Sequence, residues 1–410
     1  MTVLAWTLLA GVAWVGLWGA VLLALRGRWL RRLWREPVLR RPVLVLESDD
    51  WGPGPAGHAA VLRRLAATLE GFRDRDGHPA VATLGLVLAA ADGERTLASG
   101  LRMLHRRTLA APAFAPLREA LIEGEARGVF GLQLHGLDHY WAPALLAAAR
   151  QDEAVRAWLA GGETWRTEAL PAALQSRWTD ASVLPSLPLR PSEVAAAVRE
   201  EVAAFTASLG HPPAVVVPPT FQWTTEVERA WAGEGLRVLV TPGRAYEARD
   251  CAGTLVPAGG PILNGDPREG GLVAVVRDAY FEPALGHEPG RGVEALAARW
   301  RLGRPALLEM HRFNFVGPTA DPDGTLGAVR ALLGRCLAES PEVRFLTTEA
   351  LAEALRGRRP GYVATRWAPR LRAWLARAGE GRRMRWALEL SGLAGIVRLA
   401  AALAAASRAR

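Results

Sequence analysis

The chain has 410 residues, half of them hydrophobic, which is enough for one large domain of about 250–300 residues with appendages. Its formal net charge of +9 rests on arginine alone, because the sequence contains no lysine. Much of the excess lies at the two ends, so we expect no nucleic-acid partner. Cys251 and Cys336 are the only cysteines, lie far apart and form no CxxC pattern, so they give no indication of a disulfide framework or a thiolate metal site.

Residues 1–25 are apolar and carry no charged side chain. About 20 such residues span a bilayer as a helix, and no signal-peptide cleavage pattern is evident, so we predict a transmembrane anchor. A basic juxtamembrane segment, residues 26–41, follows with seven arginines. The positive-inside bias then predicts a single-pass membrane protein whose globular part lies on the cytoplasmic face. The alternative is an uncleaved export anchor of the opposite orientation.

Residues 359–410 form a second basic region. Trp367, Leu371, Trp374 and Leu375 recur at one face of a helix, with arginines between them. This pattern predicts a basic amphipathic tail lying on an anionic membrane surface. Packing of the same apolar face against the protein itself is the alternative.

The central segment, residues 42–358, alternates short apolar runs with longer amphipathic ones. The predicted strands are 43–46, 80–89, 129–134, 214–217, 236–240, 272–276, 306–310 and 343–346. The predicted helices are 59–72, 117–126, 142–160, 191–209, 225–234, 292–301, 324–339 and 347–355. Such alternation is typical of an α/β domain built from parallel βα units, closed as a barrel or open as a doubly wound sheet. Residues 161–191 break the pattern and are expected to form an irregular insertion.

Polar side chains cluster where the predicted strands end. Asp49 and Asp50 follow the first strand, His135 the third, Arg277 and Asp278 a later one, and His311 the seventh. In (β/α) barrels the active site lies at the carboxyl ends of the strands, so we expect these residues to converge. Because side chains alternate along an extended segment, Asp49 and Asp50 are expected to point in different directions.

His135 and His139 stand four residues apart in the segment His-Gly-Leu-Asp-His. Two imidazoles and the Asp50 carboxylate would form a three-ligand site with positions left open, which is the catalytic kind of metal site. Nitrogen and oxygen ligands suit a first-row divalent ion. We therefore predict a divalent metal, with zinc first and cobalt, manganese or nickel as alternatives.

These residues, in this chain order, resemble the polysaccharide deacetylase family, the NodB-like carbohydrate esterases. The resemblance covers about residues 42–356 and implies an irregular (β/α) barrel. It also implies Asp49 as the catalytic base, Asp50, His135 and His139 as metal ligands, and His311 as the general acid.

The sequence departs from the family pattern at two motifs. The family's Asp-Asp-Gly is Asp-Asp-Trp-Gly here, which makes Trp51 a candidate substrate contact. Its Arg-x-Pro-Tyr motif is replaced by Val217-Pro218-Pro219-Thr220, so the backbone N–H of Thr220 is the expected oxyanion donor. The missing arginine leaves Arg277 and Arg312 as candidates for the cation beside the base or the substrate.

Asp278 has two interpretations. As a carboxylate near a strand end it could orient His311, as carboxylates do for catalytic imidazoles. A salt bridge with a nearby arginine is the alternative.

The predicted activity is that of a membrane-anchored, metal-dependent hydrolase acting on a C–N bond other than a peptide bond. It would remove an acetyl or formyl group from an N-acylated sugar in a polysaccharide or a lipid-linked glycan precursor. One alternative is a metal-independent glycosidase that pairs Asp49 with Asp278 or Glu309. Another is a non-catalytic glycan-binding or scaffold protein. The sequence leaves the sugar and the oligomeric state open.

Overall fold

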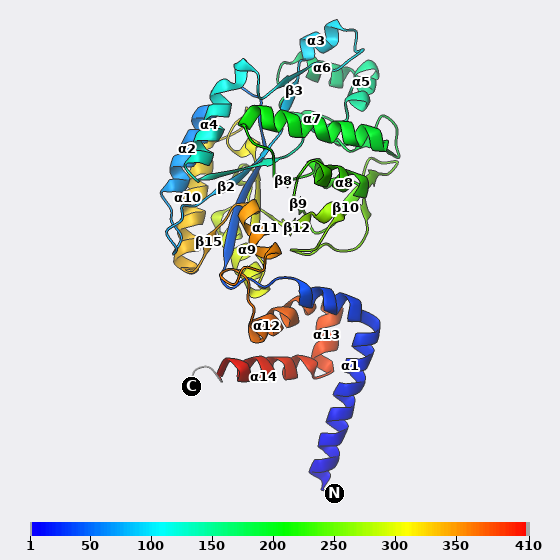
Figure 1. The fold of residues 1–410 in the computed structure, drawn as a ribbon, viewed down its shortest axis with the longest axis vertical. Helices are drawn as coiled ribbons and strands as arrows, with labels where there is room; N and C mark the ends of the chain where they lie inside the picture. Colours follow the sequence, from blue (N-terminus) through cyan, green and yellow to red (C-terminus); the bar gives the residue numbers. More distant parts are fainter. Residues whose placement is uncertain (1, 407–410) are drawn as a thin grey trace.

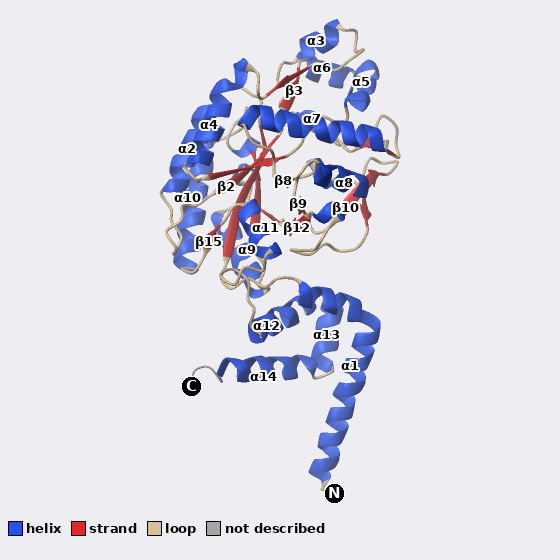
Figure 2. Cartoon of the chain, in the orientation of Figure 1, coloured by secondary structure: helices blue, strands red, loops and turns tan. Residues whose placement is uncertain are grey.

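A computed structural model of the chain describes residues 2–406. Its centre is a parallel sheet in the order β12-β9-β8-β5-β2-β1-β14-β13, with β15 paired to β1 (Figure 2). The nine strands are β1 (Val43–Trp51), β2 (Ala82–Leu86), β5 (Phe130–Leu134), β8 (Val215–Val216), β9 (Val238–Thr241), β12 (Val273–Val276), β13 (Ala279–Tyr280), β14 (Ala306–His311) and β15 (Arg344–Phe345). In the described residues β12 and β13 do not pair with one another, so the predicted irregular (β/α) barrel is a curled half-barrel.

Helices cover the outer face of the sheet. In the order α9-α10-α2-α4-α7-α8 each contacts the next, so they form a continuous layer (Figure 1). The helices of the domain are α2 (His58–Glu70), α3 (Gly93–Ala98), α4 (Ala115–Ala126), α5 (Ala142–Gln151), α6 (Glu153–Ala160), α7 (Pro191–Leu209), α8 (Thr225–Gly233), α9 (Pro289–Arg301), α10 (Pro322–Glu339) and α11 (Thr348–Arg356).

The apolar run of β1 is buried on both faces, which explains why it lacks the apolar–polar alternation of a half-exposed strand. Leu44 and Leu46 belong to the core formed with the covering helices. Val43 and Val45 belong to a second core that includes residues of β8, β9 and α11. The strand therefore joins both cores and holds its carboxyl end in a fixed position.

The insertion predicted over residues 161–191 is largely irregular, as expected. It contains one 3₁₀ turn, Thr167–Ala169, and the short hairpin β6 (Thr179–Asp180) and β7 (Leu187–Pro188). The helix predicted over 142–160 is two helices, because the extended residue Asp152 ends α5 and caps α6 through a bond from Ala154 N–H. Two further hairpins are β3 (Ala89–Ala91) with β4 (Arg106–Thr108), and β10 (Ala245–Arg249) with β11 (Leu255–Ala258).

Four helices lie outside the half-barrel: α1 (Val3–Arg35), α12 (Trp367–Ala378), α13 (Arg382–Leu390) and α14 (Leu393–Ala406) (Figure 1). We call them the terminal helical module. Leu30 and Leu33 of α1 share a small core with Trp374 and Leu375 of α12. The alternative of packing on the protein is thus observed for part of the amphipathic face, whereas Trp367 remains half exposed.

Arg377 of α12 joins this module to the domain. Its buried guanidinium donates to five backbone carbonyls, those of Leu33, Glu36, Pro37, Leu302 and Gly303. The last two residues precede β14, so the module attaches at the amino edge of the sheet. The predicted functional residues lie at the opposite, carboxyl edge.

By length and composition α1 could cross a membrane. Its 33 residues correspond to about 50 Å of helix, more than the roughly 30 Å of a hydrocarbon core. A signal sequence passes the same test. The pair formed by α13 and α14, bent by 78°, qualifies only if the two helices are counted as one broken span.

Candidate active site

Both aspartates at the end of β1 point toward His135. The Nε2 atom of His135 lies 3.4 Å from Asp50 Oδ1 and 3.9 Å from Asp49 Oδ2. The expectation that the two carboxylates diverge is therefore wrong. Asp50 adopts a left-handed backbone conformation, with φ 71°, and the β1–β2 register shifts between Ser48 and Trp51. Positive φ is costly for a residue with a side chain and is concentrated at functional sites.

The two histidines lie in the loop that follows β5, not on a helix. Gly136, with φ 97°, turns the chain directly after His135, and the two imidazole rings come to 4.7 Å between centroids. His135 Nδ1–H donates to the carbonyl of Val217 at 2.8 Å, so its Nε2 is the atom that faces the two carboxylates. His139 Nδ1 lies 2.9 Å from Thr167 Oγ1, and a proton held on this nitrogen leaves the His139 Nε2 lone pair free.

Asp50, His135 and His139 have the geometry of a metal site. One ligand atom from each lies within 4.8 Å of the others. Asp50 Oδ1 and His139 Nε2 are buried, and neither has a hydrogen-bond partner among the described residues. Burial lowers the pKa of His139 to about 4, so its imidazole is neutral, as a metal ligand must be. These orphaned, converging atoms fit a divalent cation.

Buried ion pairs fix the position of the loop that carries the two histidines, residues 135–139. Asp138, between the two histidines, accepts from Arg106 Nε at 2.6 Å and from Arg177 Nη1 at 2.5 Å. Arg177 also binds Glu201 of α7 at 2.9 Å, and all three of Asp138, Arg177 and Glu201 are buried. The sequence analysis missed this network, because its members come from β4, the loop, the insertion and α7.

Arg277 is the cationic partner of Asp49. Its Nη2 donates to Asp49 Oδ2 at 2.7 Å and its Nη1 to Glu47 Oε2 at 2.8 Å. Glu309 Oε1 lies 3.1 Å from the same Nη2. Burial opposes ionisation of Asp49, but the charges of Arg277 and His135 outweigh it and lower the pKa of that carboxyl. Asp49 is thus held ionised, as a general base requires.

Glu282, and not Asp278, orients His311. His311 Nδ1 lies 2.6 Å from Glu282 Oε1, and the backbone N–H of His311 donates to Glu282 Oε2 at 3.2 Å. Burial opposes protonation of the imidazole, but this hydrogen bond and nearby carboxylate charge raise the pKa of His311 to about 10. Asp278 instead pairs with Arg299 of α9 at 2.9 Å, which was its alternative interpretation.

Two other candidates, Trp51 and Arg312, have different surroundings from those expected. Trp51 is buried in the core, where its Nε1–H donates to Ser48 and its ring packs on Phe315 at 5.8 Å, so it does not face a substrate. Arg312 is buried, has no carboxylate partner in the part of the chain that the structure describes, and donates to the carbonyls of Pro53 and Trp165. It therefore supports the loops around the site and does not neutralise the base.

Thr220 lies beside the histidine loop. An added Cβ on Gly136 would come within 3.1 Å of Pro219, which places the Pro218–Thr220 segment against that loop. Thr220 and Phe221 both have positive φ, 52° and 53°, and Phe221 lies under the Arg277 guanidinium at 5.1 Å. Consecutive strained residues at such a place are consistent with a backbone donor role for Thr220.

Sequence reasoning missed Glu47 and Glu282. Glu47 shares its strand face with Asp49, two residues on, and this spacing was a readable signal. Glu282 follows a two-residue strand, too short to recognise. His58 is buried against Trp165, and burial beside Arg312 lowers its pKa to about 4.

No protein-family model and no curated protein matches this sequence. Among solved structures, the peptidoglycan deacetylase PdaC from Bacillus subtilis is similar at 12% identity and TM-score 0.37, over 78% of this chain and 94% of its own. A family 4 carbohydrate esterase from Streptomyces lividans is similar at 12% identity and TM-score 0.33, over 74% and 91%. A CE4 family pseudoenzyme from Bacillus anthracis is similar at 12% identity and TM-score 0.35, over 76% and 66%.

Proposed function

We propose that this chain is a divergent polysaccharide deacetylase, a metal-dependent hydrolase that removes an acetyl or formyl group from an N-acylated sugar. The observation that carries the proposal is the convergence, at one edge of the sheet, of three possible ligand atoms, two of them without a hydrogen-bond partner, beside a buried aspartate and a histidine. Asp50, His135 and His139 would hold the ion, with Asp49 and His311 beside it. Zinc suits this ligand set, and cobalt, manganese and nickel are alternatives.

When bound, a divalent ion supplies Lewis acidity and lowers the pKa of water to about 7. Asp49, ionised through Arg277, accepts the proton of the attacking water. The Thr220 N–H is the proposed donor to the oxyanion that forms on the acyl carbon. His311 holds its proton at neutral pH because Glu282 stabilises the imidazolium, and its Nε2–H passes that proton to the leaving amine. Each proton transfer typically contributes about 10²–10⁴-fold.

The glycosidase alternative has weaker geometric support. Asp49 and Glu309 both contact the Nη2 atom of Arg277, at 2.7 and 3.1 Å, so no sugar fits between them. A glycosidase needs its two carboxyls to flank the scissile bond, about 5–9.5 Å apart. Asp278 is engaged with Arg299.

The membrane part of the proposal rests on charge. We propose that α1 anchors the protein in a single pass and that the arginines of residues 26–41 keep the domain on the cytoplasmic face. A reporter fused after residue 360 and accessible only from outside would contradict this orientation.

The decisive experiment measures bound metal and deacetylation together, using the full chain in detergent. Asp50→Ala and His135→Ala should each abolish binding of about one divalent ion per chain. Asp49→Asn is the matched control, because it should keep the ion and lose deacetylation of an N-acetylated chitooligosaccharide. An absence of metal after reconstitution with zinc, cobalt or manganese would overturn the mechanism. Full metal without turnover on any N-acylated glycan would favour the binding-protein alternative.

A further inference from the structure

A hollow lies in the terminal helical module, between α1 and α13. It has a volume of about 610 Å³ and is mostly apolar, with Trp18, Leu22, Leu25 and Met384 among its lining side chains. Three arginines, Arg26, Arg382 and Arg383, also line it. We call this hollow the α1–α13 groove.

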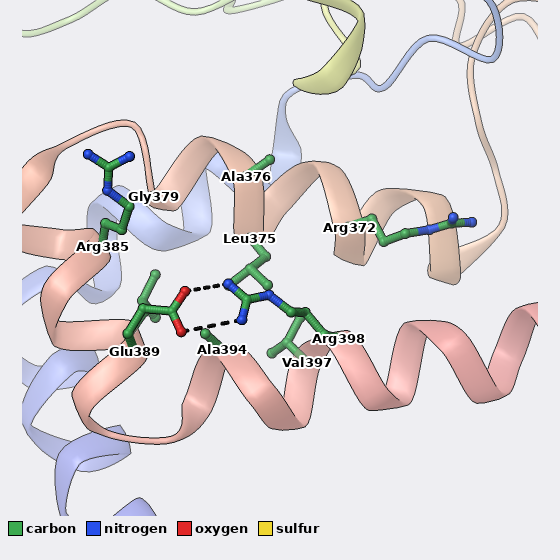
Figure 3. Close-up of a pocket in the computed structure, with 10 residues that line it drawn as sticks. Arg372, Leu375, Ala376, Gly379, Arg385, Glu389, Ala394, Val397 and Arg398 are labelled. Atoms are coloured by element: carbon green, nitrogen blue, oxygen red, sulfur yellow. Dashed lines mark hydrogen bonds and ion pairs between the residues drawn. The ribbon is translucent and has the colours of Figure 1, made fainter.

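The charge of the groove is uncompensated. No acidic residue lines it, and no ion pair of Arg26, Arg382 or Arg383 occurs within the described part of the chain. The cavity between α12, α13 and α14 differs in that Glu389 pairs there with Arg398, one of the three arginines in its lining (Figure 3). The two hollows are similarly built from apolar helix faces, but only the α1–α13 groove has no acidic side chain in its lining.

The groove lies along α1 where the apolar part of the helix meets its basic part, which is the composition expected at a membrane–water interface. Arg26 is the first charged residue of the chain, so the lining residues from Trp18 to Trp29 run from the apolar part of α1 into its basic part. Tryptophans gather at this interface in membrane proteins. Trp14 Nε1–H donates to the carbonyl of Leu390 and ties the two helices together on the apolar side. Trp18 Nε1 is buried and has no partner among residues 2–406.

We propose that the α1–α13 groove binds one anionic phospholipid. An acyl chain lies along the apolar side chains of α1 and α13, and the phosphate is bound by the three arginines at the basic end. Apolar lining alone would accept any lipid, whereas three unpaired guanidiniums select a negative headgroup. This proposal is independent of the catalytic one, since the groove belongs to the module at the amino edge of the sheet.

The test is native mass spectrometry of the full chain in detergent, with equal amounts of phosphatidylglycerol and phosphatidylcholine added. One phosphatidylglycerol should be retained per chain in preference to phosphatidylcholine. Replacing Arg26, Arg382 and Arg383 by alanine should weaken its retention on the order of 100-fold. Ala387→Trp, which fills the groove but keeps the arginines, should also abolish retention.

The matched control replaces Arg372, Arg385 and Arg398, which line the other cavity, and should retain the lipid. Circular dichroism checks that each variant is folded. Equal retention of the two lipids, retention by the groove variants, or equal loss in the control would overturn the proposal. Displacement of the lipid by soluble glycerol phosphate would show a phosphate site instead of a lipid groove.

Discussion

At the scale of single residues, three buried carboxyl groups share one guanidinium at the carboxyl edge of the sheet. Glu47, Asp49 and Glu309 surround the one guanidinium of Arg277. Burial raises the pKa of Glu309 to about 7 and raises that of Glu47, whereas the pKa of Asp49 is lowered. The negative charge is therefore concentrated on the carboxylate proposed as the base.

Arg277→Ala should destabilise the fold by about 3–5 kcal/mol, because it leaves buried carboxylates without their counter-charge. Chemical denaturation at pH 7 measures this loss. Glu309→Gln is the control and should cost little, since Glu309 is already about half protonated at that pH. Equal losses in the two variants would show that the guanidinium is not what compensates the cluster.

Glu282→Gln should change how stability depends on pH. The pKa of His311 is about 10 in the folded protein, above the ordinary value of 6.5. The stabilisation from this shift is therefore fully present below about pH 6.5 and disappears as pH rises to about 10. Removing the Glu282 carboxylate should remove most of the slope across this window.

Denaturation midpoints between pH 6 and 10 test this expectation, with His311→Gln as the second variant that should flatten the same window. An unchanged slope in both would contradict the assignment of the raised pKa to this pair. In an active preparation, the fall of kcat at alkaline pH should move to lower pH in Glu282→Gln.

At the scale of elements, strand ends and the glycines beside them build the site. The register shift of β1 against β2 lets Asp49 and Asp50 face the same side, and Gly85 of β2 makes room for them. A Cβ on Gly85 would lie 2.2 Å from Asp49 Oδ1 and 3.3 Å from His135 Cβ. The absence of a side chain at this position is thus a requirement of the site.

Gly85→Ala should lower deacetylation on the order of 100-fold while the protein stays folded, because the proposed base Asp49 and the proposed metal ligand His135 are displaced together. Activity and metal content of the purified protein measure the effect. Gly131→Ala on β5 is the matched control, since its Cβ would crowd Thr347 instead of the site. Comparable losses in the two variants would indicate general strain in the sheet.

At the scale of the whole molecule, the terminal helical module and the candidate site lie at opposite edges of the sheet. From Val43 to Asp49 the chain of β1 advances about 20 Å. If α1 spans the membrane, the site faces away from the bilayer. This placement favours a free or polymeric glycan over a sugar attached directly to a lipid.

In proteoliposomes, the full chain should deacetylate a soluble N-acylated oligosaccharide and leave a short lipid-linked disaccharide in the same bilayer unchanged. Mass spectrometry of both glycans measures the outcome. Release of residues 36–410 by proteolysis provides the control, because the freed domain can reach either substrate by diffusion. Preferential turnover of the lipid-linked sugar by the anchored chain would contradict the inferred placement.

The sequence alone determined the α/β class, the apolar N-terminal helix and the polar residues at the strand ends. Local patterns carry this information, since burial sets the periodicity of strands and helices. Asp49, Asp50, His135, His139 and His311 were predicted to converge, and the structure brings them to one edge of the sheet.

The partners of these residues were decided only by the tertiary structure. Arg277 was one of two candidates for the cation beside Asp49, and the structure selects it. Glu282, and not Asp278, contacts His311, and Trp51 lies in the core. Each outcome depends on which strand lies next to which and on backbone torsions such as φ 71° at Asp50. Strand order and single torsions arise from packing over the whole domain, so no local pattern encodes them.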